Sequence, residues 1–336
     1  MSVSKESANS LQNAYSPSAG LSNQEALKLL FPNLSFLTEL ERMRIRAGNR
    51  IKGLLAGKRR SSSLGGSQEF ADYRPYSSGD DIRRIDWNVY GRTGKAFIRQ
   101  YWDEQELQVS LYIDVSQSMA FGHSDTNKLQ YALRLAACLG HIALCGDDRI
   151  SVRLFRDTII RELQPLHGRV SSSKLFHFLA DAMQQLERDS DSSSPAAIKK
   201  FVNMAAPFQT AAALPRRSGS AWVLTDAMFE QGIEETLISL TAAGQQVVLV
   251  HLLSPEELSP DLSGELKLID CELGTGKEVA IGQKLLHEYR SAVAGFQNEL
   301  KSICAARGAS YIFVDTGVSL EETVRHTFLS SHVLNS

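Results

Sequence analysis

From residue 107 onward, short apolar runs alternate with longer stretches in which apolar residues recur every three or four positions. The short runs predict β-strands at 107–113, 150–155, 221–225, 246–252 and 310–314. The helical spacing predicts α-helices near 126–145, 173–188, 232–243, 283–306 and 319–329. Regular alternation of this kind is typical of an α/β fold with a doubly wound, mostly parallel sheet and helices on both faces.

The N-terminal part of the chain lacks this alternation and predicts an irregular extension. Residues 1–20 are rich in Ser, Asn, Ala and Gly, and we expect a disordered tail. Residues 21–66 predict a basic extension of helix and loop, whose helical spacing is interrupted near Pro32. Within it, Ser61–Ser67 has the composition of a loop.

The remaining departures from the pattern set the domain boundaries. Residues 67–106 form an Arg-, Asp- and aromatic-rich segment that we expect to pack on a core domain at 107–330. Inside that domain, the polar stretch 189–220 predicts a surface insertion, and 264–282 predicts a hairpin added to the sheet.

Composition and charge narrow the functional classes. A chain of 336 residues with 43% hydrophobic and 22% charged residues is ordinary for a soluble globular protein. The net charge of −2 provides no overall attraction to nucleic acid or anionic membranes. No apolar stretch reaches the roughly 18 residues of a membrane span, and the polar N-terminus has no signal-peptide core. The cysteines form no C-x-x-C pair, so we expect free thiols and a cytoplasmic location.

Polar residues stand where two of the predicted strands end. Asp114, Ser116 and Ser118 follow the first strand, and Thr225 and Asp226 end a later one. Alternate residues leaving a strand point to the same side, so one carboxylate and two hydroxyls converge. Hard oxygen donors of this kind suit Mg²⁺ or Mn²⁺. In α/β proteins, binding sites lie at the carboxyl ends of the parallel strands, which is where these residues stand. The two strand ends resemble the metal-ion-dependent adhesion site of von Willebrand factor A domains.

Each of these residues also has a structural interpretation. Asp114, Ser116 and Ser118 could simply cap the helix that begins near Asp125, because Asp and Ser favour helix starts. Asp226 could be a turn residue after a strand, where Asp is common. In von Willebrand factor A domains the aspartate matching Asp226 is usually followed by Gly, whereas here it is followed by the nearly as small Ala227.

The third loop of such a site normally brings a threonine. The stretch between 163 and 175 has none, but three serines precede a predicted helix there. Ser172, or its neighbour Ser171 or Ser173, is therefore the expected additional ligand, with a plain N-cap as the alternative.

The segment from Gly65 to Lys95 is dense in Arg, Asp and aromatic residues. We expect an ion-pair network to fix an irregular loop, formed by Asp80, Asp81 and Asp86 with Arg83, Arg84 and Arg92. Trp87 and Tyr90 are expected to anchor the loop by burial. Either a partner-docking surface or a rigid cap on the sheet edge would account for this composition.

The same segment carries a more specific resemblance. Its run Tyr73-Arg-Pro-Tyr, Gly79-Asp-Asp-Ile-Arg and Ile85-Asp-Trp, followed by the Asp114-x-Ser-x-Ser motif, resembles the bacterial domain of unknown function 58 family. The likeness runs from about 50 to 330 and includes Ser254-Pro-Glu-Glu. It implies a von Willebrand factor A-like core and association with a MoxR-type AAA+ ATPase.

These observations favour a non-enzymatic protein–protein interaction module that uses Mg²⁺ or Mn²⁺ to bind a carboxylate-bearing partner. A metal-dependent hydrolase using Asp114 and Asp226, or a metal-free scaffold, is the alternative. Eight basic residues between 42 and 60 suggest nucleic-acid binding, but they lack interleaved aromatics. A solvated helix face or contact with an acidic partner is favoured for them.

Overall fold

The computed structural model describes residues 21–46, 60–64, 70–104, 106–123, 126–192, 203–260, 264–269 and 276–335. They divide into two compact units: one combines Met1–Arg46 with Leu107–Ser336, and the other is Ala47–Glu106. The expected tail at 1–20 and most of the basic stretch at 42–60 lie outside the described residues.

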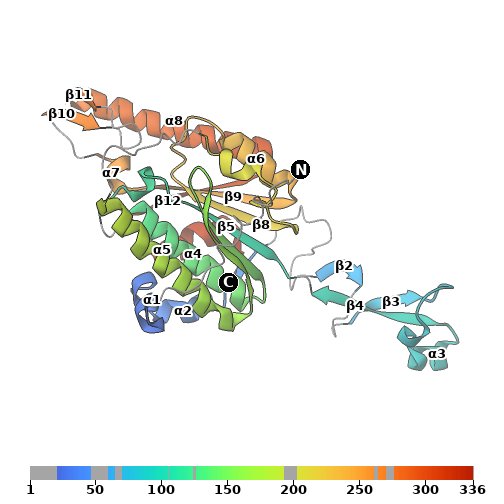
Figure 1. The fold of residues 1–336 in the computed structure, drawn as a ribbon. Helices are drawn as coiled ribbons and strands as arrows, with labels where there is room; N and C mark the ends of the chain where they lie inside the picture. The colour runs from blue at the N-terminus through green and yellow to red at the C-terminus, as the bar shows by residue number, and fades with distance from the viewer. Residues whose placement is uncertain are drawn as a thin grey trace, which may run out of the picture. The chain divides into compact units, whose positions relative to one another are not determined.

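A six-stranded sheet with the strand order β12-β9-β8-β5-β6-β7 forms the centre of the larger unit (Figure 1). Its strands are β5 (Gln108–Asp114), β6 (Arg149–Phe155), β7 (Ile159–His167), β8 (Gly219–Thr225), β9 (Gln245–Leu253) and β12 (Ser310–Asp315). All are parallel except β7, which runs antiparallel to β6 at the edge. Both β5 and β8 are buried along their whole length, which is why their sequences are mostly apolar on both faces of the strand. The predicted mostly parallel α/β sheet is confirmed.

Helices cover both faces of this sheet (Figure 1). One face carries α4 (Lys128–Cys145) and α5 (Ser172–Ser192), and the other carries α6 (Ile233–Ala242) and α8 (Gln283–Arg307). Asn127 caps α4 by accepting a hydrogen bond from the Gln130 backbone, and most of the helix behind it is buried. None of the helices in the described ranges has both the length and the apolar character that crossing a bilayer requires.

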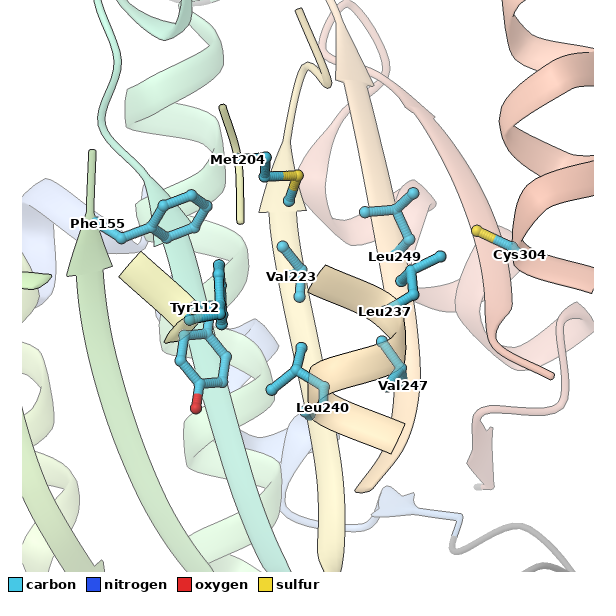
Figure 2. Packing of buried hydrophobic residues seen from close by; sticks show 11 residues of the cluster. Tyr112, Phe155, Met204, Val223, Leu237, Leu240, Val247, Leu249 and Cys304 are labelled. Atoms are coloured by element: carbon cyan, nitrogen blue, oxygen red, sulfur yellow. The ribbon is translucent and has the colours of Figure 1, made fainter. Parts of the chain in front are cut away.

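Within the stretch predicted as a surface insertion at 189–220, residues 203–220 contribute to the hydrophobic core, which corrects the prediction for this part. Met204, just before η5 (Ala206–Gln209), and Phe208, within η5, are each 1% exposed. The Phe208 ring packs on Tyr112 of β5 and Phe155 of β6, with centroids 5.0 and 5.4 Å away. Figure 2 shows Met204 in the same buried cluster as Tyr112 and Phe155. The polar composition around these apolar residues concealed their burial.

The N-terminal helices belong to the larger unit, although the sequence suggested a separate extension up to residue 66. They are α1 (Asn23–Leu30) and α2 (Ser35–Leu40), followed by β1 (Arg44–Ile45), which pairs with β13 (Leu334–Asn335). Phe31 and Phe36 are buried, and the Phe31 ring meets Phe176 of α5 edge to face. The apolar spacing of this region therefore serves packing on the domain.

The expected hairpin is present as β10 (Gly264–Ile269) and β11 (Gly276–Ile281), but it forms its own two-stranded sheet. It does not extend the central sheet. The thiols are free at the three described cysteines, with Cys138 and Cys304 buried and Cys145 partly exposed. The remaining cysteine, Cys271, lies outside the described residues.

The smaller unit is a three-stranded sheet in the order β2-β4-β3 with a short helix. Its elements are β2 (Arg60–Leu64), β3 (Phe70–Pro75), η1 (Ile82–Arg84), α3 (Trp87–Thr93) and β4 (Phe97–Glu104). The strand β2 occupies much of the predicted Ser61–Ser67 loop. The expected packing of 67–106 on the core domain stays a prediction.

Asp86 organises the smaller unit. One carboxylate oxygen accepts hydrogen bonds from Tyr73 Oη and Arg99 Nε, both at 2.7 Å, and the other caps α3 by accepting from the Asn88 and Val89 amides. The Arg99 guanidinium and the Tyr73 hydroxyl hold the pKa of Asp86 well below its usual value. The acids of this segment do form ion pairs, Asp86 with Arg99 and Asp80 with Arg74. The expected partners Arg83, Arg84 and Arg92 form no ion pair with these acids in the described residues, so that part of the prediction is wrong.

The expected burial of the two aromatic anchors is wrong. Trp87 is 60% exposed and Tyr90 is 45% exposed. The Asp86 network fixes the fold of this segment instead, so the aromatic rings remain at the surface.

Candidate functional site

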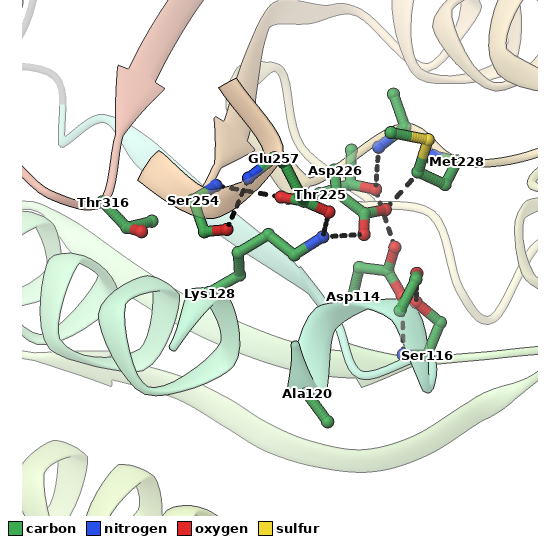
Figure 3. A network of polar contacts seen from close by, with 12 residues as sticks. Asp114, Ser116, Ala120, Lys128, Thr225, Asp226, Met228, Ser254, Glu257 and Thr316 are labelled. Carbon is green, nitrogen blue, oxygen red and sulfur yellow. Dashed lines mark hydrogen bonds and ion pairs between the residues drawn. The ribbon is translucent and has the colours of Figure 1, made fainter. Parts of the chain in front are cut away.

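The candidate site lies where the strand order reverses direction. From β5 the chain passes to β6 on one side and later returns to β8 on the other, so the loops after β5 and β8 separate at the carboxyl edge. Asp114 is the last residue of β5, and Asp226 directly follows β8. The hydroxyl of Thr225 donates a hydrogen bond of 2.7 Å to Asp114 Oδ2 (Figure 3). The prediction that these two strand ends meet is confirmed.

Asp114 is a fully buried carboxylate. Besides the Thr225 bond, its Oδ1 accepts a hydrogen bond from the Ser116 amide at 2.8 Å. The hydroxyls of Ser116 and Ser118 lie 3.0 Å apart on the same turn. Within the described ranges, no basic side chain pairs with Asp114, and burial together with the nearby Asp226 charge raises its pKa.

Asp226 has a cationic partner that the sequence analysis missed. Lys128 Nζ donates to Asp226 Oδ2 at 2.7 Å and to Glu257 Oε1 at 2.6 Å (Figure 3). The Lys128 and Asp226 side chains are fully buried. Burial opposes the charged lysine, but the two carboxylates outweigh it and raise the pKa of Lys128.

Glu257 reaches this lysine from a third strand end. It lies in α7 (Pro255–Leu258), which follows β9, and it forms a capping box with Ser254. Its Oε2 accepts from the Ser254 amide, which leaves Oε1 for Lys128. The Ser254-Pro-Glu-Glu stretch, noted in the sequence only as part of a resemblance, thus contributes a carboxylate to the site.

A signal for Lys128 did exist in the sequence. It is the first residue of α4, and a lysine is unfavourable there because the helix dipole makes that end electropositive. The residues that follow are almost entirely apolar and buried. A buried lysine at such a position requires carboxylate partners, and Asp226 and Glu257 supply them.

The residue after Asp226 has an unusual backbone. Ala227 is fully buried and adopts φ 57°, in the left-handed region that normally favours glycine. This conformation costs an alanine roughly 1–2 kcal/mol, so the replacement of the expected Gly is less conservative than its size suggests. The turn directs the Met228 amide to Asp226 Oδ1 at 3.1 Å.

Ser172 does not join the site, which corrects the expected third ligand. Because β7 is antiparallel, it returns the chain to the opposite edge, where His167 pairs with Arg149 at the start of β6. The Ser172 hydroxyl contacts His141 Nδ1 at 3.0 Å. His141 lies thirteen residues after Lys128 on α4, or about 20 Å along the helix axis. Ser171 and Ser173 adjoin Ser172, so they also lie at the opposite edge of the sheet from Asp114.

The residues that remain are compatible with a divalent cation. The single Lys128 ammonium pairs with both Asp226 and Glu257, and no cation in the described residues pairs with Asp114, so acidic groups outnumber basic ones at the site. Oxygen donors of this kind are the ones that Mg²⁺ and Mn²⁺ prefer. No group of three or more His, Cys, Asp and Glu in the described residues is arranged to hold a metal. Any ion here would therefore depend on the serine hydroxyls as well as on carboxylates.

Comparison with known proteins agrees with the sequence resemblance. A family model described as protein of unknown function DUF58 matches residues 72–299. The uncharacterized protein Rv1480 of Mycobacterium tuberculosis is 24% identical over 278 residues, covering 82% of this chain and 84% of the relative.

Two solved structures are similar to part of the chain. They are the conserved hypothetical protein BatB from Bacteroides thetaiotaomicron, with 16% identity, and an aerotolerance-related membrane protein from Bacteroides fragilis, with 18% identity. Each has a TM-score of 0.38 and covers 67% of this chain, with 98% and 99% of the respective neighbour matched. Since the family model spans well over half of the sequence, the chain belongs to the DUF58 family.

Proposed function

We propose that this protein is a non-enzymatic interaction module whose site at the carboxyl edge of the sheet binds a partner's carboxylate through Mg²⁺ or Mn²⁺. The proposal depends mainly on the burial of the Asp114 carboxylate. This carboxylate is fully buried next to Asp226 without a cationic partner among the described residues. Burying a carboxylate without a cationic partner raises the free energy of the folded state, and a bound divalent ion would offset that increase.

Asp114, Ser116 and Ser118 are the residues that would hold the ion, with Asp226 binding it directly or through water. The ion would supply an electrophilic position that attracts an incoming carboxylate. Asp226 can contribute because each carboxylate oxygen accepts more than one hydrogen bond, and Lys128 occupies only part of that capacity.

The surroundings of the site suit a protein partner. Phe121, three residues after Ser118, is 50% exposed, and Met228, two residues after Asp226, is 46% exposed. The Phe121 ring centroid lies 5.8 Å from Lys128 Nζ. Apolar side chains next to a polar centre are typical of interface cores, where aromatic residues and methionine are enriched.

The family resemblance extends the proposal. It implies that the sheet domain is of the von Willebrand factor A type and that the partner is a MoxR-type AAA+ ATPase. The strand-end positions of Asp114 and Asp226 support the first part, because adhesion sites of that type use the same edge of the sheet.

A binding assay tests this function. Full-length protein and its Asp114→Ala variant are compared for binding to the MoxR-type ATPase of the same organism, at saturating Mg²⁺ and in a chelator. We expect binding by the wild type that requires the metal and is lost in the variant. Intact binding by Asp114→Ala at saturating Mg²⁺ would show that the proposed mechanism is wrong.

A further inference from the structure

A second polar and aromatic surface lies on the smaller unit, at η1 and α3. Trp87 and Tyr90 are exposed there, and their rings meet edge to face with centroids 6.0 Å apart. Arg83 and Arg84, just before this pair in sequence, are exposed as well. We call these four residues the Trp87 face. Exposed apolar side chains that adjoin one another and are bordered by polar residues are typical of interaction sites.

A shallow cavity of about 350 Å³ opens on the Trp87 face. It is lined by Arg83, Arg84, Ile85, Asp86, Trp87, Asn88 and Arg99. The single acid in this lining, Asp86, is 3% exposed and already accepts hydrogen bonds from Arg99 and Tyr73. The Asp86 charge is therefore compensated by Arg99 and does not balance the charges of Arg83 and Arg84.

The two arginines have no hydrogen-bond or ion-pair partner for their side chains in the part of the chain that the structure describes. In contrast, neighbouring Arg74 pairs with Asp80 at 2.7 Å. The cavity is therefore lined by two arginines whose charges no described residue pairs, together with Trp87. Guanidinium groups pair with carboxylates through two parallel hydrogen bonds.

From this geometry we propose that the Trp87 face binds an acidic segment of a partner protein, with Asp or Glu side chains on Arg83 and Arg84 and an apolar side chain against Trp87. Trp, Tyr and Arg are the residue types most enriched among the residues that dominate binding energy at protein interfaces. The face provides all three within eight positions of the chain.

An acidic protein segment suits this surface better than a nucleic acid does. Asp81, two residues before Arg83, has no cationic partner among the described residues and would repel a continuous phosphate backbone that passes over the arginines. Asp81 is fixed in place because it caps η1 by accepting from the Arg83 amide. The chain as a whole is also slightly acidic. A peptide with separated carboxylates avoids this repulsion.

The proposal is independent of the metal-assisted function, because it depends on different residues in a different unit. The test is therefore performed in EDTA, which removes divalent ions from the Asp114 site. A phage library of random short peptides is selected on the full-length protein. We expect the enriched peptides to contain several Asp or Glu residues next to an aromatic or aliphatic residue.

Matched variants then assign the binding to the face. The double variant Arg83→Glu, Arg84→Glu should weaken binding of a selected peptide about tenfold or more, and Trp87→Ala should also weaken it. The control is Arg216→Glu, Arg217→Glu, which reverses two exposed arginines of the larger unit and should change nothing. Because Trp87 is largely exposed, its removal should leave the folded state intact, which circular dichroism checks.

Several results would overturn the proposal. These are no enrichment above the bare support, enrichment of neutral or basic peptides, or equal binding by the wild type and the Arg83→Glu, Arg84→Glu variant. Binding of a single-stranded oligonucleotide that is lost in that variant, without acidic-peptide binding, would assign the face to nucleic acid instead.

Discussion

The ammonium of Lys128 lies 2.7 Å from the carboxylate of Asp226, and both side chains are fully buried in the larger unit. This pair connects the start of α4 to the loop after β8, and Glu257 joins the loop after β9 to the same nitrogen. One buried charge therefore holds three segments of the site together (Figure 3).

Replacing Lys128 by methionine should strongly destabilise the protein. The change leaves Asp226 and Glu257 without their cation, and breaking a buried ion pair from one side costs roughly 3–5 kcal/mol. Urea unfolding of the Lys128→Met variant in EDTA measures this loss. Adding Asp226→Asn and Glu257→Gln to the variant should recover much of it, because the buried charges are then removed as well.

The control for that experiment is Lys284→Met. Lys284 is 93% exposed and pairs with Glu288 at a distance of 3.8 Å on α8. Exposed pairs contribute about 0–1 kcal/mol, so this variant should unfold almost as the wild type does. If Lys128→Met were as stable as Lys284→Met, the buried ion pair would have no structural role.

The Asp86 network predicts a pH dependence in the smaller unit. Because the pKa of Asp86 is lowered on folding, its contribution is fully present above the unfolded value near 4 and is lost as the pH falls through the lower folded value. The stability difference between wild type and Asp86→Asn should therefore be constant from pH 7 to about 5 and shrink below about 4. Hydrogen exchange of peptides within 70–99, corrected for intrinsic rates, measures it. A difference that grows with acid would contradict this assignment.

Two glycines should respond to alanine in opposite directions. A Cβ at Gly219 would lie 2.0 Å from the Gln108 carbonyl oxygen of the paired strand β5, so Gly219→Ala should destabilise by roughly 1–3 kcal/mol or more. Gly295 is an exposed position inside α8, with open space where a Cβ would be added. Gly295→Ala should therefore stabilise by about 0.5–1 kcal/mol. Thermal unfolding of both variants checks the two signs, and destabilisation by Gly295→Ala would contradict the second.

The parts of the site predictable from sequence were those on buried central strands. The strands ending at Asp114 and Thr225 are buried throughout and mostly apolar, so their ends could be located and assigned to one edge. The edge strand β7 could not be recognised, because it is only partly buried and contains Pro165, which is typical of edges. Without that strand, the chain reversal that carries Ser172 to the opposite edge was not predictable.

Side-chain environments were harder to infer than strands. Lys128 is the first residue of an apolar, buried helix, which hints at its burial, but its carboxylate partners lie 98 and 129 positions away in sequence and could not be identified. Trp87 was expected to be buried because aromatic residues usually are, yet hydrogen bonds to Asp86 fix its segment without it. Long-range contacts of this kind are set by the fold and leave no local pattern.

A titration with Mg²⁺ and with Mn²⁺, followed by calorimetry, tests the proposed metal site most directly. It compares the wild type with Asp114→Ala and, as a control carboxylate on α5, Asp181→Ala, which loses an ion pair to Arg161. We expect saturable binding by the wild type and Asp181→Ala that is lost in Asp114→Ala. Absence of saturable binding by the wild type, or unchanged binding by Asp114→Ala, would contradict a metal-assisted site at this edge of the sheet.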